Sequence, residues 1–209
     1  MSDSLRKEGV MICCSALKRE VESLCRTHWR CHRLVFSPSL LHMHPERMAA
    51  SLESVLETEL GRSRGVVMIY GDCCARMTAL EALPMVARTK GKNCFELLLG
   101  HDEYHRLSHE GAFFIVPEWG GHWKEVFFKG LGLNSENVVG LMRKMHNKLI
   151  YLDTGLVQRP EKDLCECAEF LRLPYESLSV SLEHLRATVE EALLRCITKV
   201  FLLETKLSK

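Results

Sequence analysis

The chain has 209 residues, 10 of them cysteine, and a formal net charge of +1 with basic and acidic residues interspersed. A chain of this length buries about 70% of its unfolded surface on folding, so disulfide staples are not needed for stability. The sequence lacks the basic cluster of a nucleic-acid-binding protein, the run of about 18 apolar residues that spans a membrane, and the apolar core of a signal peptide. We therefore expect a cytoplasmic protein with reduced thiols and with no nucleic-acid or membrane partner.

Short apolar runs alternate with helical patterns along the chain. Strands are predicted at residues 10–17, 32–40, 65–71, 112–119 and 148–155. Helices are predicted at residues 17–25, 45–60, 75–88, 136–147, 160–173 and 182–203, and residues 94–100 fit either element. Continuously apolar strands separated by helices are typical of a parallel sheet with helices on both faces. The sequence thus predicts a single Rossmann-like α/β domain at residues 10–203, with a mainly parallel sheet of at least five strands and flexible tails at residues 1–9 and 204–209.

Reactive side chains follow every predicted strand. In an open parallel sheet, ligands bind beyond the carboxyl ends of the strands, so these side chains are the candidate site residues. In chain order they are Cys13 and Cys14, then His42 and His44, then Asp72, Cys73 and Cys74, then Glu118 and Trp119, and finally Asp153. Cys94 precedes the segment at 94–100, and a helix starting there would favour a thiolate at its N-terminus.

Three thiols and one imidazole from separate loops would form a Cys3His set, which is a normal tetrahedral set for a transition metal. Neighbouring strand residues point to opposite faces, so we expect one member of each cysteine pair to join the site. His42 is favoured over His44 because the residue before Pro45 is held extended at the start of a helix. Thiolates select zinc, copper(I) or iron. The predicted centre is therefore a zinc or iron site that takes Cys94, His42 and one cysteine of each pair, with Cys14 and Cys73 favoured by the strand-end rule. The residues expected around it are Asp72, Cys74, Glu96, Glu118, Trp119 and Asp153.

Two other interpretations remain open on the residues alone. A thiol redox protein would pair Cys73 with Cys94 or Cys14, although the usual C-x-x-C spacing is absent. A metal-free binding module would hold a small ligand, such as a corrinoid, at the strand ends. No glycine-rich phosphate loop and no G-x-S-x-G motif is present, which disfavours nucleotide binding and serine hydrolysis. The remaining cysteines fit a role as small apolar core residues: Cys25, Cys31, Cys165, Cys167 and Cys196.

Six motifs in this order resemble the prokaryotic domain-of-unknown-function family numbered 1638, over residues 10–185. They are "ICCSALKREV", "LLHMHPERM", "IYGDCCA", "NCFELLLG", "GAFFIVPEW" and "KLIYLDTG". The resemblance places the family's three cysteines on Cys14, Cys73 and Cys94 and its histidine on His42. The sequence departs from the family pattern at Ser15 and Cys74, where family members usually have glycine. The resemblance implies an α/β protein associated with corrinoid-dependent methyl transfer, so that an enzyme or carrier in one-carbon metabolism is expected, with a small molecule or a corrinoid protein as its partner.

Overall fold

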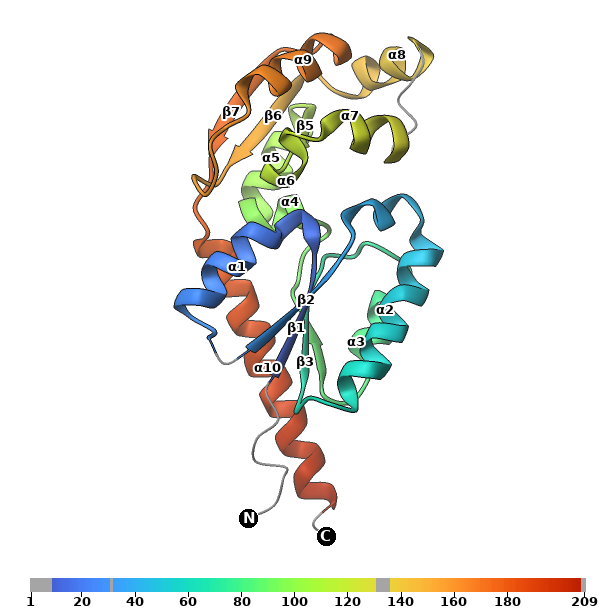
Figure 1. Cartoon of the computed structure of the whole chain (residues 1–209), viewed down its shortest axis with the longest axis vertical. Helices are drawn as coiled ribbons and strands as arrows, with labels where there is room; N and C mark the ends of the chain where they lie inside the picture. The colour runs from blue at the N-terminus through green and yellow to red at the C-terminus, as the bar shows by residue number, and fades with distance from the viewer. Residues whose placement is uncertain (1–8, 31, 131–135, 208–209) are drawn as a thin grey trace.

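The computed structural model describes residues 9–30, 32–130 and 136–207, and its strands form two parallel sheets (Figure 1). The first sheet has the strand order β2-β1-β3-β4 and the second has the order β5-β6-β7. The strands are β1 (Gly9–Cys14), β2 (His32–Ser37), β3 (Val66–Ile69), β4 (Val86–Arg88), β5 (Ala112–Ile115), β6 (Lys148–Asp153) and β7 (Tyr175–Ser179).

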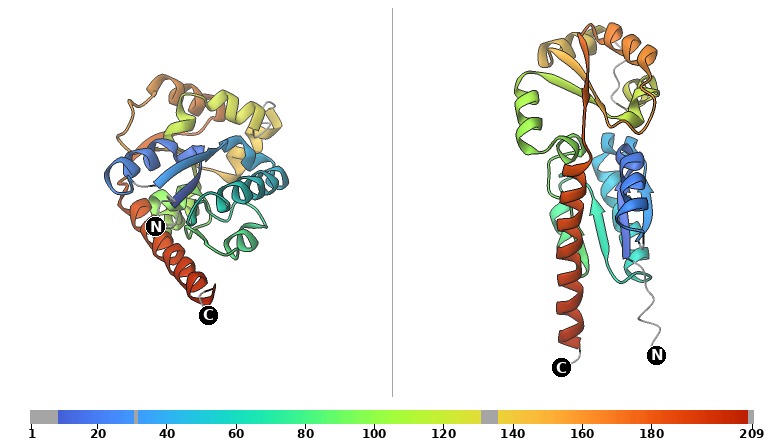
Figure 2. Two further views of the ribbon diagram at one scale, coloured as in Figure 1. Left: turned by 60° about the horizontal axis from the view of Figure 1, so that its bottom comes forward. Right: turned by 90° about the vertical axis from the view of Figure 1, so that its left-hand side faces the viewer.

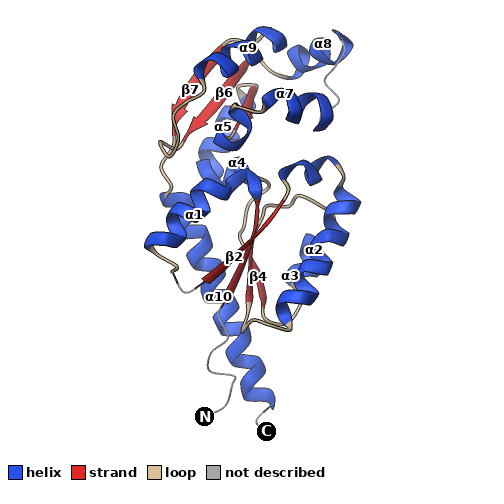
Figure 3. Ribbon diagram, in the orientation of Figure 1, coloured by secondary structure: helices blue, strands red, loops and turns tan. Residues whose placement is uncertain are grey.

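Helices connect these strands. The α-helices are α1 (Lys18–Thr27), α2 (Pro45–Leu60), α3 (Met77–Glu81), α4 (Cys94–Leu99), α5 (His101–His109), α6 (Pro117–Gly120), α7 (Trp123–Glu125), α8 (Glu136–Met145), α9 (Glu161–Leu171) and α10 (Glu183–Leu207). Shorter helical turns are η2 (Ser15–Leu17), η3 (Ser39–Met43) and η4 (Val126–Gly130). In the first sheet, α1 and α10 cover one face and α2 and α3 cover the other, which explains why every residue of β3 is buried (Figure 3).

The strand order of the first sheet changes direction between β1 and β3, which makes a topological switch point at its carboxyl edge. Strand β1 pairs in parallel with β2 on one side and with β3 on the other. The chain reaches β2 through α1 on one face of the sheet and reaches β3 through α2 on the opposite face (Figure 3). Such a reversal separates the loops beyond the two central strands, and α/β proteins bind ligands at this position.

The carboxyl edges of the two sheets face each other (Figure 1), and the region between these edges is called the crevice below. Thr154, directly after β6, donates a hydrogen bond of 2.9 Å to Glu20 on α1. Arg19 on the same helix lies 3.5 Å from the Glu118 carboxylate on α6. Side chains of both sheets belong to one buried cluster. The α/β class, the parallel pairing and the single core are therefore confirmed, whereas the expected single sheet is in fact two, because apolar patterns do not specify which strands pair.

Several element boundaries differ from those predicted. Residues 75–88 are not one helix, because α3 ends before Pro84 and the chain then turns at Met85, with a φ of 59°, into strand β4. Strand β7 was not predicted because its residues are mostly exposed or half-buried. Gly9 begins β1 and α10 continues to Leu207, so both predicted tails are shorter, and their remaining residues lie outside the described ranges.

Helix α10 returns from the second sheet and packs against the strands of the first (Figure 2). Its last turns project past the first sheet, and the helix exposes the apolar side chains Leu194, Ile197, Phe201 and Leu202 on the side away from the strands. In the described ranges, neither α10 nor any other helix combines the length and the apolar character that crossing a membrane requires.

Candidate metal centre

Cys14 and His42 meet at the carboxyl ends of two neighbouring strands. Cys14 is the last residue of β1, and His42 lies in η3, just after the adjacent strand β2. The Cys14 sulfur lies 3.1 Å from His42 Nε2. Cys13 points the other way, since its fully buried thiol donates to the Cys14 carbonyl oxygen. His44 is exposed and caps α2 only through its backbone, so its side chain is placed at the surface.

Gly71 brings the loop that carries Cys73 against the loop that leads to Cys94. A Cβ at Gly71 would overlap the backbone of Asn93 and would lie 2.5 Å from the carbonyl carbon of Lys92. The backbone N–H of the next residue donates to the Gly91 carbonyl oxygen at 3.0 Å. Only a residue without a side chain permits this approach. The glycine therefore allows the loops after β3 and β4 to lie side by side at the sheet edge.

Cys94 is the first residue of α4 and is 5% exposed. The Asn93 side chain caps this helix by accepting a hydrogen bond of 3.0 Å from the Glu96 N–H. Burial raises the pKa of the Cys94 thiol well above its ordinary value, and the nearby Cys14 and Cys73 thiols raise it further. The three sulfurs thus lie within electrostatic range of one another.

Cys14 and Cys94 are buried, whereas His42 and Cys73 are half-buried. Burial, with a smaller contribution from Cys73, raises the pKa of Cys14 to about 12. Burial raises the pKa of Cys73 to about 11, against the opposing effect of the Arg88 guanidinium. Burial lowers the pKa of His42, so its imidazole is neutral at physiological pH. A neutral imidazole beside protonated thiols is ready to take up a cation, which offsets the cost of forming buried thiolates.

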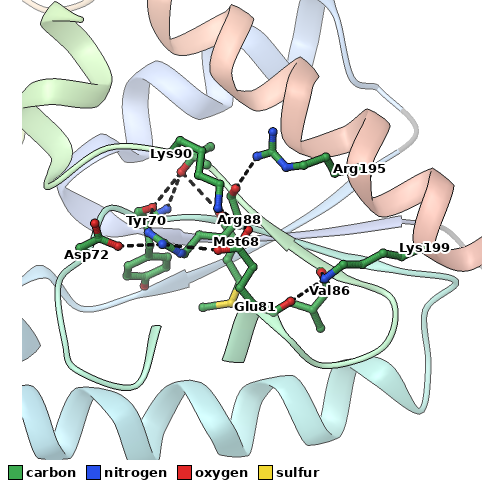
Figure 4. Close-up of polar contacts among 10 residues, drawn as sticks. Met68, Tyr70, Asp72, Glu81, Val86, Arg88, Lys90, Arg195 and Lys199 are labelled. Atoms are coloured by element: carbon green, nitrogen blue, oxygen red, sulfur yellow. Dashed lines mark hydrogen bonds and ion pairs between the residues drawn. The ribbon is translucent and has the colours of Figure 1, made fainter. Parts of the chain in front are cut away.

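The loop that carries Cys73 is fixed by a polar network beneath it (Figure 4). Arg88, whose side chain is only 5% exposed, donates to Asp72 Oδ1 at 2.7 Å and to the Tyr70 carbonyl oxygen at 3.3 Å. The Thr89 hydroxyl accepts from the Tyr70 N–H and donates to the Tyr70 carbonyl oxygen. The predicted pocket residue Asp72 therefore anchors the loop by pairing with Arg88.

The same network attaches α10 to the sheet edge. Arg195 donates to the Arg88 carbonyl oxygen at 2.7 Å (Figure 4). Lys199 donates to the carbonyl oxygens of Glu81 and Val86, both at 2.6 Å. The C-terminal helix is thereby attached to both ends of β4 and to the end of α3.

The residues predicted around the ligands differ in their placement. Glu118 on α6 lies close enough to raise the pKa of Cys14. Trp119 is buried and packs edge-to-face on Phe95, with ring centroids 5.8 Å apart. Asp153 accepts a hydrogen bond of 2.9 Å from Gly155 and so shapes the turn after β6. All three residues therefore come from the part of the chain that forms the second sheet, and Glu118 lies near enough to Cys14 to affect its pKa.

Two further predicted neighbours have contacts of their own. Cys74 is half-buried, and its proximity raises the pKa of Cys73. The Glu96 carboxylate accepts from the Lys92 N–H at 3.0 Å and lies 3.0 Å from His101 Nδ1. Glu96 is thus engaged on the outer side of α4 by a histidine that the sequence reasoning did not select.

Glu20 is a buried acid that the sequence reasoning missed. It is 1% exposed, and burial raises its pKa. One carboxylate oxygen accepts from Thr154, and the other has no hydrogen-bond partner among the described residues. The buried Trp119 Nε1 and Tyr151 hydroxyl are also unpartnered there. Its position on the same helical face as the buried Val21 and Leu24 is the sequence signal by which Glu20 could have been found.

The distances among possible ligand atoms differ between the candidate cysteine and histidine ligands and a second cluster of side chains on α4 and α5. A zinc ion bound tetrahedrally at about 2.3 Å from each sulfur holds these sulfurs roughly 3.5–4 Å apart. In the described part of the chain, the trio whose ligand atoms all lie within 4.8 Å of one another is Glu96, His101 and His105. No three of the ligand atoms of Cys14, His42, Cys73 and Cys94 lie within 4.8 Å of one another in the described structure.

Comparison with known proteins gives one match. A family model described as "Protein of unknown function (DUF1638)" matches residues 36–189. This range contains His42, Cys73 and Cys94, whereas Cys14 lies before it. No curated protein and no solved structure matches the chain.

Proposed function

The chain belongs to the DUF1638 family, and we propose that it is a cytoplasmic metal-site protein in which Cys14, His42, Cys73 and Cys94 hold a zinc or iron ion. The observation that carries the proposal is the 3.1 Å contact between the Cys14 sulfur and His42 Nε2. It joins a soft thiol and a neutral imidazole at the strand ends where α/β proteins bind ligands.

A Cys3His set with all four ligands bound is typical of a structural site, whereas three bound ligands would leave one coordination position open for chemistry. If three of the four side chains held the ion and the fourth position stayed open, a zinc or iron ion here would act as a Lewis acid or would activate a bound thiol or water. The crevice also contains the unpartnered oxygen of Glu20 and the unpartnered donors of Trp119 and Tyr151. These groups would bind and orient a small polar substrate from the side of the second sheet. An enzyme or carrier of corrinoid-linked methyl or one-carbon metabolism, acting on a small molecule or a corrinoid protein, would use such a site.

Thiol redox chemistry is the weaker alternative. A redox thiol must be a thiolate to attack a disulfide, and reactive cysteines therefore have a lowered pKa. Here burial raises the pKa of Cys14 to about 12 and that of Cys73 to about 11. Among the described cysteines, none is paired in a disulfide.

A metal-free binding module is the second candidate. The observation that favours it is the set of buried polar atoms without partners at the facing sheet edges, on Glu20, Trp119 and Tyr151. A small ligand with its own donors and acceptors would satisfy these atoms without any ion. In that case the thiols of Cys14, Cys73 and Cys94 would not contact the ligand, and their replacement would leave ligand binding intact.

Metal content separates these functions. The protein is purified anaerobically, and zinc and iron are measured per chain by mass spectrometry. We expect loss of bound metal in Cys14→Ser, His42→Ala, Cys73→Ser and Cys94→Ser. The matched controls are Cys74→Ser and His44→Ala, which change the neighbouring thiol and the neighbouring imidazole and should retain the metal. Equal metal content in all variants, or an absence of metal from the wild-type protein, would contradict the proposal.

A further inference from the structure

A second group of ligating side chains lies on the outer side of α4, away from the crevice thiols. Glu96 is in the first turn of α4, and its side chain is only 9% exposed. Gly100, with a φ of 83°, ends this helix and begins α5 at once. His101 and His105 are one helical turn apart on α5, and their ring centroids are separated by 4.3 Å. The sharp turn therefore folds the two histidines back over the carboxylate.

The contacts show how these groups are held. Glu96 Oε1 lies 3.0 Å from His101 Nδ1, while Oε2 accepts from the Lys92 N–H at 3.0 Å. The Lys92 ammonium lies 3.0 Å from His105 Nε2. Each of Glu96, His101 and His105 offers one ligand atom, and these three atoms all lie within 4.8 Å of one another. A cation already approaches this cluster, in the form of the ammonium group.

We propose that Glu96, His101 and His105 form a second metal site, which binds a divalent transition ion of the zinc class independently of the crevice cysteines. Two imidazoles and one carboxylate are a set that binds zinc with further coordination positions left open to water. Divalent first-row ions that accept imidazole ligands suit such a set, and magnesium and calcium suit it less.

The surroundings of Glu96 resemble those that orient a ligand. The hydrogen bond from the Lys92 backbone fixes the carboxylate, as second-layer contacts do in metal sites. The exposed His101 ring and the half-buried His105 ring have room to rotate toward a shared ion. For an ion to enter, the Lys92 ammonium must move away from His105. The ion would then clamp α4 to α5 across Gly100, and α4 begins with Cys94.

The test is a Co²⁺ titration of the purified full chain, followed by calorimetry and absorption. Binding at the second site adds no thiolate-to-cobalt charge-transfer absorption, whereas binding at the cysteines does. We expect His101→Ala and His105→Ala to weaken the binding phase that lacks thiolate absorption by at least about tenfold. Lys92→Met should strengthen this phase because the competing ammonium is gone.

His109→Ala is the matched control. His109 follows His105 by one more turn, with ring centroids 6.3 Å apart, but it is not part of the trio. Its replacement should leave the titration unchanged. Wild-type affinity in His105→Ala, or equal weakening in His109→Ala, would overturn the second site. Loss of thiolate absorption alone, with this phase intact, would count against the cysteine site only.

Discussion

The Thr154 hydroxyl donates a hydrogen bond of 2.9 Å to the Glu20 carboxylate, and this contact joins the two sheets of the protein. Thr154 follows the central strand of the second sheet, whereas Glu20 lies on the helix that follows the first strand of the chain. The contact lies at the edge of the crevice where Cys14 and His42 meet. The four candidate ligands lie at or after the ends of strands of the first sheet, and from the second sheet's side Glu118 lies near enough to raise the pKa of Cys14.

Glu20 should make the stability of the fold depend on pH. Burial raises its pKa, so the folded protein binds this proton more tightly than the unfolded chain does. The free energy of unfolding therefore falls as the pH rises from the unfolded pKa through the folded one. Glu20→Gln removes this titration but keeps the oxygen that accepts from Thr154. Relative to wild type, the variant should gain stability between about pH 4.5 and neutral pH.

Urea denaturation at several pH values measures this effect. Glu22→Gln, on the same helix but half-buried, is the matched control and should follow the wild-type curve. A Glu20→Gln protein that loses stability relative to wild type as the pH rises would show that the carboxylate charge is compensated within the fold.

Gly71→Ala should separate the two loops that carry Cys73 and Cys94. The added methyl group would overlap the Asn93 backbone, so one loop must shift. We expect a loss of about 1–3 kcal/mol in the free energy of unfolding, as for other overpacked sites, together with reduced metal content. Gly121→Ala is the control, because a Cβ there meets no atom within 4 Å. If the two variants were equally stable and equally loaded, the close approach at Gly71 would have no part in forming the site.

Metal binding at the cysteines should release protons. With pKa values of about 12 and 11, Cys14 and Cys73 are protonated at pH 7, and the raised pKa of Cys94 keeps its thiol protonated as well. The lowered pKa of His42 leaves its imidazole with no proton to lose. Binding should therefore release about three protons per ion, and affinity should rise with pH.

Calorimetry in buffers of different ionisation enthalpy counts the released protons. The measurement uses the His105→Ala protein, so that the second site does not contribute. Zinc binding without any buffer-dependent heat would mean that the thiols do not become thiolate ligands.

Part of this architecture could be predicted from the sequence. Apolar runs located the strands β1 and β3, and the rule that ligands bind at carboxyl ends selected Cys14 and Cys73. The contact between Cys14 and His42 follows because β1 and β2 are consecutive, parallel and adjacent. The pairing of strands into two sheets could not be predicted, because an apolar pattern indicates burial but does not identify the partner strand.

Other features depend on contacts that are distant in the sequence. The burial of Glu20 requires the second sheet, which contributes a residue 134 positions away. The spacing of His101 and His105 is visible in the sequence as one helical turn. Their proximity to Glu96 is not visible there, because it depends on the sharp turn at Gly100 between two separate helices.

X-ray absorption at the zinc or iron edge tests the metal centre most directly. The sample is anaerobically purified His105→Ala protein, in which the second site is disabled and the crevice side chains are unchanged. We expect sulfur neighbours at about 2.3 Å together with a nitrogen neighbour at about 2.0–2.1 Å, as for cysteine and histidine ligands to zinc. A spectrum explained by nitrogen and oxygen neighbours alone, or a protein without metal, would contradict the assignment of Cys14, His42, Cys73 and Cys94 as ligands.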